Sequence, residues 1–256
     1  MIESRTFHCP ALGRPHPYSV HIPPQPPPPG GWPLVLLLHG AGRSHRTIAD
    51  NAETAALIEA APFVTVFPEG ALSFYIDSPV PGQSPFQSML LELLAHARAT
   101  LPVTSAPAST AICGWSMGGF GAVRFTQDHP NEVSTVASII GLLDYPNPDI
   151  PPESNYPLPP AFGSDPAFLQ SLNCCHHAPR LRGHSIAIFA ATEAFDYQMN
   201  QNFSAALNRH AIAHLYHTVP GTHTWPAVAN LFGPLMDFLS KTLAPPTGER
   251  QQPRAN

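Results

Sequence analysis

The sequence predicts an α/β protein with a mostly parallel central sheet and helices on both of its faces. Short apolar runs such as "PLVLLLHG" at 33–40 are continuous, which is typical of strands buried on both faces. Segments with helical spacing follow most of these runs, and such alternation indicates a parallel sheet. The candidate catalytic and binding residues come directly after strands, where open α/β sheets bind their ligands.

The expected elements follow one another without an internal repeat or a strong boundary. A strand pair with a turn at "PALGRP" comes first, and a polyproline loop at 23–31 follows it, because polyproline resists both helix and sheet. The strand segments are expected at 2–9, 16–22, 33–40, 63–70, 109–116, 132–141, 184–193 and 213–221. The helices are expected at 47–61, 84–101, 117–130, 200–212 and 226–243. We expect a single domain over 1–243 and a frayed tail over 244–256.

Composition narrows the class of protein. Of the 256 residues only 11% are charged, against a usual value of about 25%, and the net charge is −5. With 12 Lys and Arg in all, the chain has no basic footprint for nucleic acid, which is therefore not an expected partner. This balance suits an uncharged or apolar small substrate better than a polyanion.

The sequence shows neither a targeting signal nor a metal-binding motif. The N-terminus has no basic region before an apolar stretch, and no apolar run reaches 18 residues, so we expect no signal peptide, no membrane span and a cytoplasmic location. The four cysteines make no disulfide framework. The cluster at 174–177, "CCHH", lacks the distant second ligand pair of a zinc site, so we expect loop residues and no metal. The sequence makes no prediction of oligomeric state.

The segment "AICGWSMGGFG" at 111–121 carries the clearest chemical signal. Gly114 to Gly118 fits G-x-S-x-G between an expected strand and an expected helix, which would expose Ser116 above the sheet as a nucleophile. The alternative without catalysis is a glycine turn that packs a helix against a strand. In the nucleophile reading, the N–H of Met117 at the helix start faces a developing oxyanion.

A serine nucleophile needs a base and a second oxyanion donor. His223 follows a strand end and a turn and precedes the last helix, which favours it over His214 and His217 inside an expected strand. The loop "HGAG" at 39–42 follows the strand whose loop carries the second donor, and the N–H of Ala41 is our choice. His39 itself is expected to position this loop.

With these motifs the chain resembles the esterase family of α/β-hydrolases, which includes esterase D, tributyrin esterases, feruloyl esterases and the antigen 85 acyltransferases. It is most similar to the tributyrin esterase branch. The resemblance covers about residues 3–243 and implies an α/β-hydrolase fold and a carboxylic-ester hydrolase without cofactor. The matching segments are "SRTFHCPALGRPHPYSVHIPP", "LLLHGAG", "FPEGALSFYIDSP", "GWSMGGFGAVRFTQDHP", "FGSDP" and "PGTHTW".

The chain departs from the family pattern where the acid of the triad belongs, since that position is Ala194 in "AATEAFDYQMN". Alanine cannot orient the imidazole or stabilise its charged form. Asp196 lies two residues on and would point to the same side of an extended loop, so it is the first choice. Glu193 points away but reaches further, and it is the second choice. Another acid, a water molecule or an impaired enzyme remain open.

Other residues are candidates for lining the pocket. Tyr75 and Asp77 follow a strand, although an aspartate there could equally cap a turn. Trp115 and Trp225 flank the expected nucleophile and base. Glu69 in "PEG" is expected to anchor a turn.

A long proline-rich excursion at 144–165 also bears on the substrate. With Tyr145, Tyr156, Leu158 and Phe162 it is expected to shape the acyl or alcohol pocket.

The sequence thus predicts a serine esterase that cleaves small, short-chain acyl esters through an acyl-enzyme. The first alternative is acyl transfer to an alcohol other than water. The second is a degenerate hydrolase that binds a ligand or partner, and Ala194 is its only support.

Overall fold

The computed structural model describes residues 1–243, and the tail expected at 244–256 lies outside the described residues. These residues form one eight-stranded sheet in the order β1-β2-β4-β3-β5-β6-β7-β8. The pairs β1–β2 and β2–β4 are antiparallel, and the remaining pairs are parallel, as the sequence predicts. The strands are β1 (Ile2–Cys9), β2 (Arg14–His21), β3 (Leu34–Leu38), β4 (Val64–Pro68), β5 (Thr110–Trp115), β6 (Thr135–Ile139), β7 (Ser185–Ala191) and β8 (Leu215–Val219).

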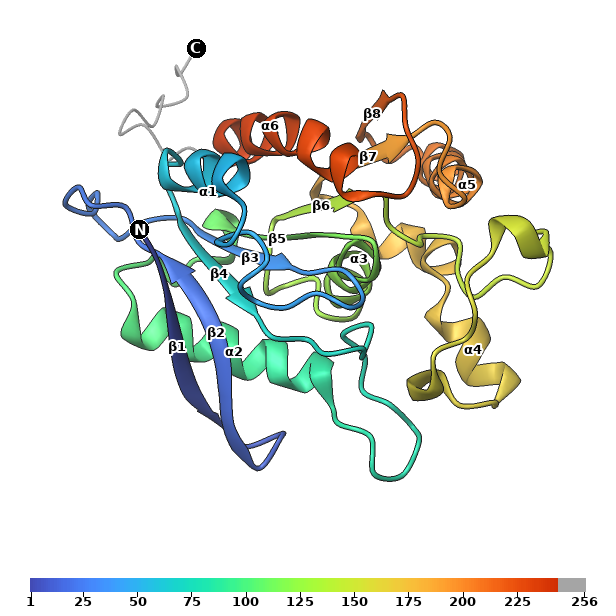
Figure 1. Cartoon of the computed structure of the whole chain (residues 1–256), viewed down its shortest axis with the longest axis horizontal. Helices are drawn as coiled ribbons and strands as arrows, with labels where there is room; N and C mark the ends of the chain where they lie inside the picture. Colours follow the sequence, from blue (N-terminus) through green and yellow to red (C-terminus); the bar gives the residue numbers. More distant parts are fainter. Residues whose placement is uncertain (244–256) are drawn as a thin grey trace, which may run out of the picture.

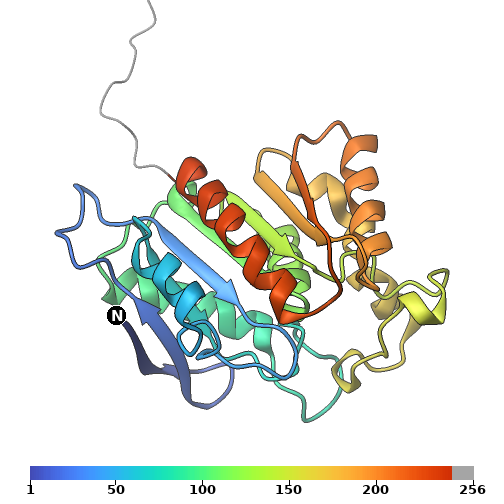
Figure 2. The same ribbon diagram turned by 45° about the horizontal axis from the view of Figure 1, so that its top comes forward.

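Helices cover both faces of the sheet because the central strands are apolar on both sides. In β3, Leu34, Leu36 and Leu38 belong to the core shared with α2, α3 and α5, whereas Val35 and Leu37 belong to the core shared with α1 and α6. Figures 1 and 2 show this layering, with α6 crossing one face beside α1. The helices are α1 (Ala52–Glu59), α2 (Phe86–Thr100), α3 (Met117–Asp128), α4 (Pro166–Leu172), α5 (Tyr197–Arg209) and α6 (Trp225–Thr242).

Three helical segments differ most from the sequence-based prediction. Helix α1 begins at Ala52 and not at 47, because the side chain of Asn51 accepts a hydrogen bond from the N–H of Thr54 and caps the helix there. Helix α4 was not predicted; Asp165 caps it and Pro166 occupies its first position. A 3₁₀ segment, Cys174–Leu181, follows α4 and was also missed.

The parallel strands bring the carboxyl ends of β3, β4, β5, β6 and β7 to one edge of the sheet, where the chemically interesting loops begin. The connection from β5 to α3 approaches β3 so closely that a Cβ at Gly118 would meet the backbone of Leu38 and His39. A Cβ at Gly114 would lie 2.6 Å from Gly118 and 2.7 Å from the carbonyl oxygen of Leu38. This contact fixes the turn after β5 against the loop after β3.

We expect Gly118→Ala to lower the free energy of unfolding by about 3 kcal/mol or more, because rigid backbone must move to admit the methyl group. Urea denaturation followed by circular dichroism measures the change. Gly13→Ala is the matched control, since Gly13 has φ 63° and open space around its Cβ position, and should cost only about 1 kcal/mol. Equal losses for the two variants would show that the close approach carries no special cost.

Candidate active site

Ser116 stands at the turn between β5 and α3, in the backbone conformation of a tight elbow. Its φ is 55° and its ψ is −121°, a region that a non-glycine residue enters only when its surroundings hold it there. The Ser116 N–H donates to the carbonyl of Ile139 at 2.9 Å, and the Ser116 carbonyl accepts from the N–H of Phe120 at 3.0 Å. Together with the close glycine contacts, these bonds hold the side chain above the sheet edge.

His223 comes from the loop between β8 and α6 and faces Ser116. The Oγ of Ser116 lies 2.8 Å from the Nε2 of His223, although the two residues are 107 positions apart in the chain. The imidazole packs against the ring of Phe195, with ring centroids 4.6 Å apart. The serine and the histidine that the sequence singled out are therefore brought within hydrogen-bond distance.

Asp196 completes this chain of hydrogen bonds. The Nδ1 of His223 donates to the Oδ1 of Asp196 at 2.6 Å, and the Nδ2 of Asn200 donates to Oδ2 at 2.8 Å. The carboxyl group is fully buried, and this burial raises its pKa above the ordinary value against the opposing effect of the bonds from His223 and Asn200. The bond to Nδ1 leaves Nε2 of the neutral ring as the acceptor toward Ser116.

The route by which Asp196 reaches the histidine differs from the expected one. Residues 191–197 do not form an extended loop, because the N–H groups of Ala194 and Tyr197 bond back to the carbonyls of Ala191 and Ala194 in successive turns. Asp196 therefore arrives from the start of α5. Ala194 is buried in an apolar cluster, and the side chain of Glu193 is exposed, with no bond to His223.

Two backbone amides adjoin Ser116 without an internal acceptor. Met117 is the first residue of α3, so its N–H has no partner within the helix. Among residues 1–243, the N–H of Ala41 donates to no protein acceptor. Both amides belong to the turns that the glycine contacts fix together, which leaves them available to a ligand at Ser116.

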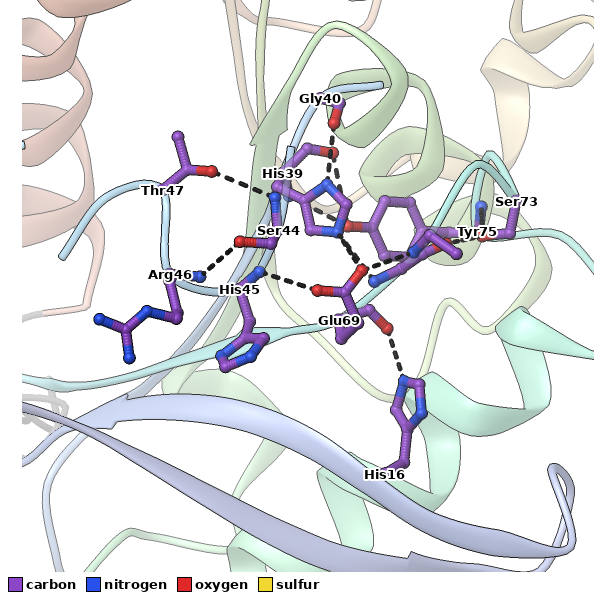
Figure 3. Close-up of polar contacts among 12 residues, drawn as sticks. His16, His39, Gly40, Ser44, His45, Arg46, Thr47, Glu69, Ser73 and Tyr75 are labelled. Carbon is purple, nitrogen blue, oxygen red and sulfur yellow. Dashed lines mark hydrogen bonds and ion pairs between the residues drawn. The ribbon is translucent and has the colours of Figure 1, made fainter. Parts of the chain in front are cut away.

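A network of polar contacts supports the loop at 39–42, which contains Ala41 (Figure 3). The Nδ1 of His39 donates to the carbonyl of Gly40 at 2.8 Å, and its Nε2 accepts from the N–H of Gly70 at 2.8 Å. The hydroxyl oxygen of Tyr75 accepts from the N–H of His39 at 3.0 Å. His39 thus links the loop after β3 to the loop after β4, which agrees with its expected positioning role.

Glu69 ties the same two loops together. Its Oε1 accepts from the N–H of Ala71 at 2.9 Å and lies 3.3 Å from Nε2 of His39, and its Oε2 accepts from the N–H of His45 at 3.2 Å. Burial by itself would raise the pKa of Glu69, but the N–H bonds from Ala71 and His45 favour the charged carboxylate and lower that pKa. Glu69 anchors a turn, in line with the interpretation of "PEG".

Two of the residues proposed to line the pocket lie elsewhere. Tyr75 is fully buried, and its hydroxyl group serves the backbone of His39. Asp77 caps α2: its Oδ1 accepts from the N–H groups of Gln87 and Ser88 at 2.8 and 2.9 Å. The capping alternative therefore describes Asp77, and Tyr75 supports the loop from behind.

The pocket that contains Ser116 and His223 has a volume of about 180 Å³. Trp115 and Trp225 both line it, in an edge-to-face pair with ring centroids 5.8 Å apart. The other lining residues are Gly40 and Ala41, from the "HGAG" loop expected at the site, and four that were not predicted from the sequence, namely Arg43, Ile140, Thr224 and Val228. Of these four, Arg43 could have been expected at the site from the sequence, because it follows the proposed oxyanion donor Ala41 by two residues.

The proline-rich excursion borders a different cavity, of about 560 Å³. Tyr145, Tyr156 and Leu158 line it, whereas Phe162 is buried in the core, and none of the four lines the pocket around Ser116. The excursion still touches the site indirectly, because Tyr156 stacks on Phe195 at 6.2 Å, and Phe195 packs against His223.

No metal-binding cluster occurs among the described residues. His176 and His177 hydrogen-bond the backbone carbonyls of Gln170 and Ser171, and His214 bonds the hydroxyl of Ser204. Within residues 1–243, no helix combines the length and the apolar character needed to cross a membrane.

The fold and the hydrogen-bonded serine, histidine and aspartate define an α/β-hydrolase. Residues 9–237 match the family described as "Putative esterase", and the chain belongs to this family. A curated relative, "Putative esterase NocK" of Nocardia uniformis subsp. tsuyamanensis, is 30% identical over 165 residues. That match covers 60% of this chain and 46% of the relative, so it spans about half of the relative's length.

Solved structures agree on the fold. An S-formylglutathione hydrolase from Agrobacterium tumefaciens superposes with a TM-score of 0.79 at 17% identity and covers 95% of both chains. A ferulic acid esterase superposes with a TM-score of 0.76 at 18% identity, over 94% of this chain and 98% of the other. The resemblance to the esterase family and the α/β-hydrolase fold are confirmed, and the placement in the tributyrin esterase branch stays a prediction.

We expect Glu69→Gln to lower the free energy of unfolding at pH 7 by about 1–3 kcal/mol, because the amide has one accepting oxygen, whereas the charged carboxylate accepts an N–H group on each of two. A depressed pKa contributes stability above the unfolded value of about 4.3, and this contribution is lost as pH falls toward 2. The free energies of unfolding of wild type and Glu69→Gln should therefore converge as the pH falls from about 5 to about 2. Urea denaturation at each pH measures them.

Glu53→Gln is the control for this experiment, since Glu53 is exposed and forms no ion pair among residues 1–243. Its effect should stay within about 0.5 kcal/mol across the same pH range. A difference between wild type and Glu69→Gln that stayed constant down to pH 2 would show that the carboxylate charge is not the source of the effect.

Proposed function

We propose that this protein is a serine esterase that hydrolyses carboxylic esters through an acyl-enzyme. The observation that carries the proposal is the continuous series of hydrogen bonds from Ser116 through His223 to the buried Asp196. Membership of the esterase family supports the same reaction class. A nucleophile, a base and an orienting carboxylate in series are the arrangement that acyl transfer to a serine requires.

Each group has a defined step. The Oγ of Ser116 attacks the ester carbonyl while Nε2 of His223 takes its proton, and Asp196 holds the tautomer and stabilises the imidazolium. The N–H groups of Ala41 and Met117 stabilise the oxyanion. His223 then protonates the departing alcohol, and in the second half water, activated by the same histidine, releases the acid from Ser116.

The proposed substrates are small esters with short acyl chains, and no cofactor takes part. A volume of about 180 Å³ beside Ser116 accommodates a few carbon atoms, and the Trp115–Trp225 pair offers them an apolar wall. Acyl transfer to another alcohol would use the same acyl-enzyme, and no feature of the pocket favours it. The degenerate-hydrolase alternative drew on Ala194, and the bond between Asp196 and His223 argues against it.

A series of p-nitrophenyl esters from acetate to octanoate tests the reaction and the chain length together. We expect the highest kcat/KM for acetate or butyrate and at least a tenfold loss by octanoate, since the longer chain exceeds the pocket. Ser116→Ala should lower kcat by about 10⁴-fold or more. Equal, slow release of nitrophenol by wild type and Ser116→Ala would refute the esterase proposal.

Asp196→Asn tests the orienting carboxylate. We expect kcat to fall by about 10²- to 10⁴-fold, because the amide cannot stabilise the imidazolium and favours the wrong tautomer. Glu193→Gln is the matched control and should change kcat less than about twofold, as this side chain is exposed and does not contact His223. The assignment of Asp196 fails if the two variants are equally active in the nitrophenyl acetate assay.

A further inference from the structure

The pocket around Ser116 contains one strongly basic side chain that the proposed reaction does not use. Arg43 is one of the ten residues that line it, and no aspartate or glutamate is among the other nine. A guanidinium group stays charged at every relevant pH and presents five donors in a planar fork. The pocket therefore combines a reacting serine with an uncompensated positive charge.

Arg43 has no acidic partner within the described part of the chain. No carboxylate of residues 1–243 lies within ion-pair distance of its guanidinium group, and the side chain is exposed. The next arginine of the same loop behaves differently: Arg46 pairs with Asp50 at 3.1 Å and does not line the pocket.

The carboxylates around the site are already engaged. Asp196 lies behind His223, fully buried and bonded to both His223 and Asn200. Glu69 accepts N–H groups on both of its oxygens. The charge of Arg43, a residue that lines the pocket, thus has no protein anion to neutralise it among residues 1–243.

The position of Arg43 along the loop keeps it close to Ala41, the proposed oxyanion donor. It follows Ala41 by two residues, so their Cα atoms are at most about 7 Å apart. Its N–H donates to the carbonyl of Gly40 at 3.2 Å, in a turn that fixes the residue on the loop of the proposed oxyanion donor. From this position the long side chain of Arg43 can reach an anionic group that lies a few bonds from the ester of a bound substrate.

We propose that Arg43 is a specificity residue and that the ester substrate carries a free carboxylate, which pairs with its guanidinium group. This inference rests on the proposed esterase function and deepens it. A carboxylate matches the fork in a bidentate manner, and it is small enough for a pocket of about 180 Å³ that also receives a short acyl or alcohol part. It replaces the expectation of an uncharged substrate, which rested on the charge of the whole chain.

The test compares esters that differ in charge and keep their shape. On the acyl side, monoethyl succinate is compared with ethyl 4-methylpentanoate, whose isopropyl group mimics the shape of the carboxylate. On the alcohol side, 4-acetoxybenzoate is compared with 4-acetoxybenzamide. Hydrolysis is followed by pH-stat, and the readout is the ratio of kcat/KM for the anionic ester to that for its neutral partner.

We expect Arg43→Gln to lower this ratio about tenfold in at least one pair, mainly through the KM of the anionic ester. Arg43→Lys should recover part of the ratio, because it keeps the charge and loses the fork. Added salt should lower the wild-type ratio, and the control Arg46→Gln should leave the ratio unchanged.

The inference is overturned if Arg43→Gln leaves the ratio within about twofold of wild type in both pairs, while Ser116→Ala abolishes hydrolysis. In that case the esterase function stands and only the role of Arg43 fails. If wild type and Ser116→Ala hydrolyse all four esters equally slowly, the proposed function fails and this inference fails with it.

Discussion

The contact between the start of α3 and the end of β3 is the constraint on which the rest of the site depends. Gly114 and Gly118 have no Cβ, so the turn at Ser116 packs directly on the backbone of Leu38 and His39. The strained serine and the Ala41 loop thereby become parts of one rigid unit. His39 and Glu69 extend this unit by bonding it to the loop after β4.

Much of this architecture could be predicted because it depends on local sequence. Continuous apolar runs marked the central strands, and the glycine pattern around Ser116 marked the elbow, since both follow from burial or close approach along a few neighbouring residues. His223 was identifiable from the chain order of the triad together with its place after a strand end and before the last helix. Helix α4 was missed because seven residues are too short for a periodic signal, and only its cap, Asp165 before Pro166, was visible.

The remaining features arise from contacts between distant segments, which spacing does not encode. Asp196 was chosen for an extended loop, yet it reaches the histidine through two turns at the start of α5. Asp77 looked equally suited to a pocket or a cap, and only the position of α2 decides between them. The isolation of Arg43 becomes visible only when the carboxylates of other loops are placed.

The amide of Asn200 has a consequence for how the protein loses its fold. Its Nδ2 donates to the carbonyl of Gly141 at 2.9 Å and to Oδ2 of Asp196, so the amide that holds the carboxylate also fastens α5 to the loop after β6. Local unfolding of α5 would withdraw Asp196 while the central strands stayed paired. Catalytic competence is thus tied to the docking of a peripheral helix, and it would fail in a partial opening well before the sheet itself came apart.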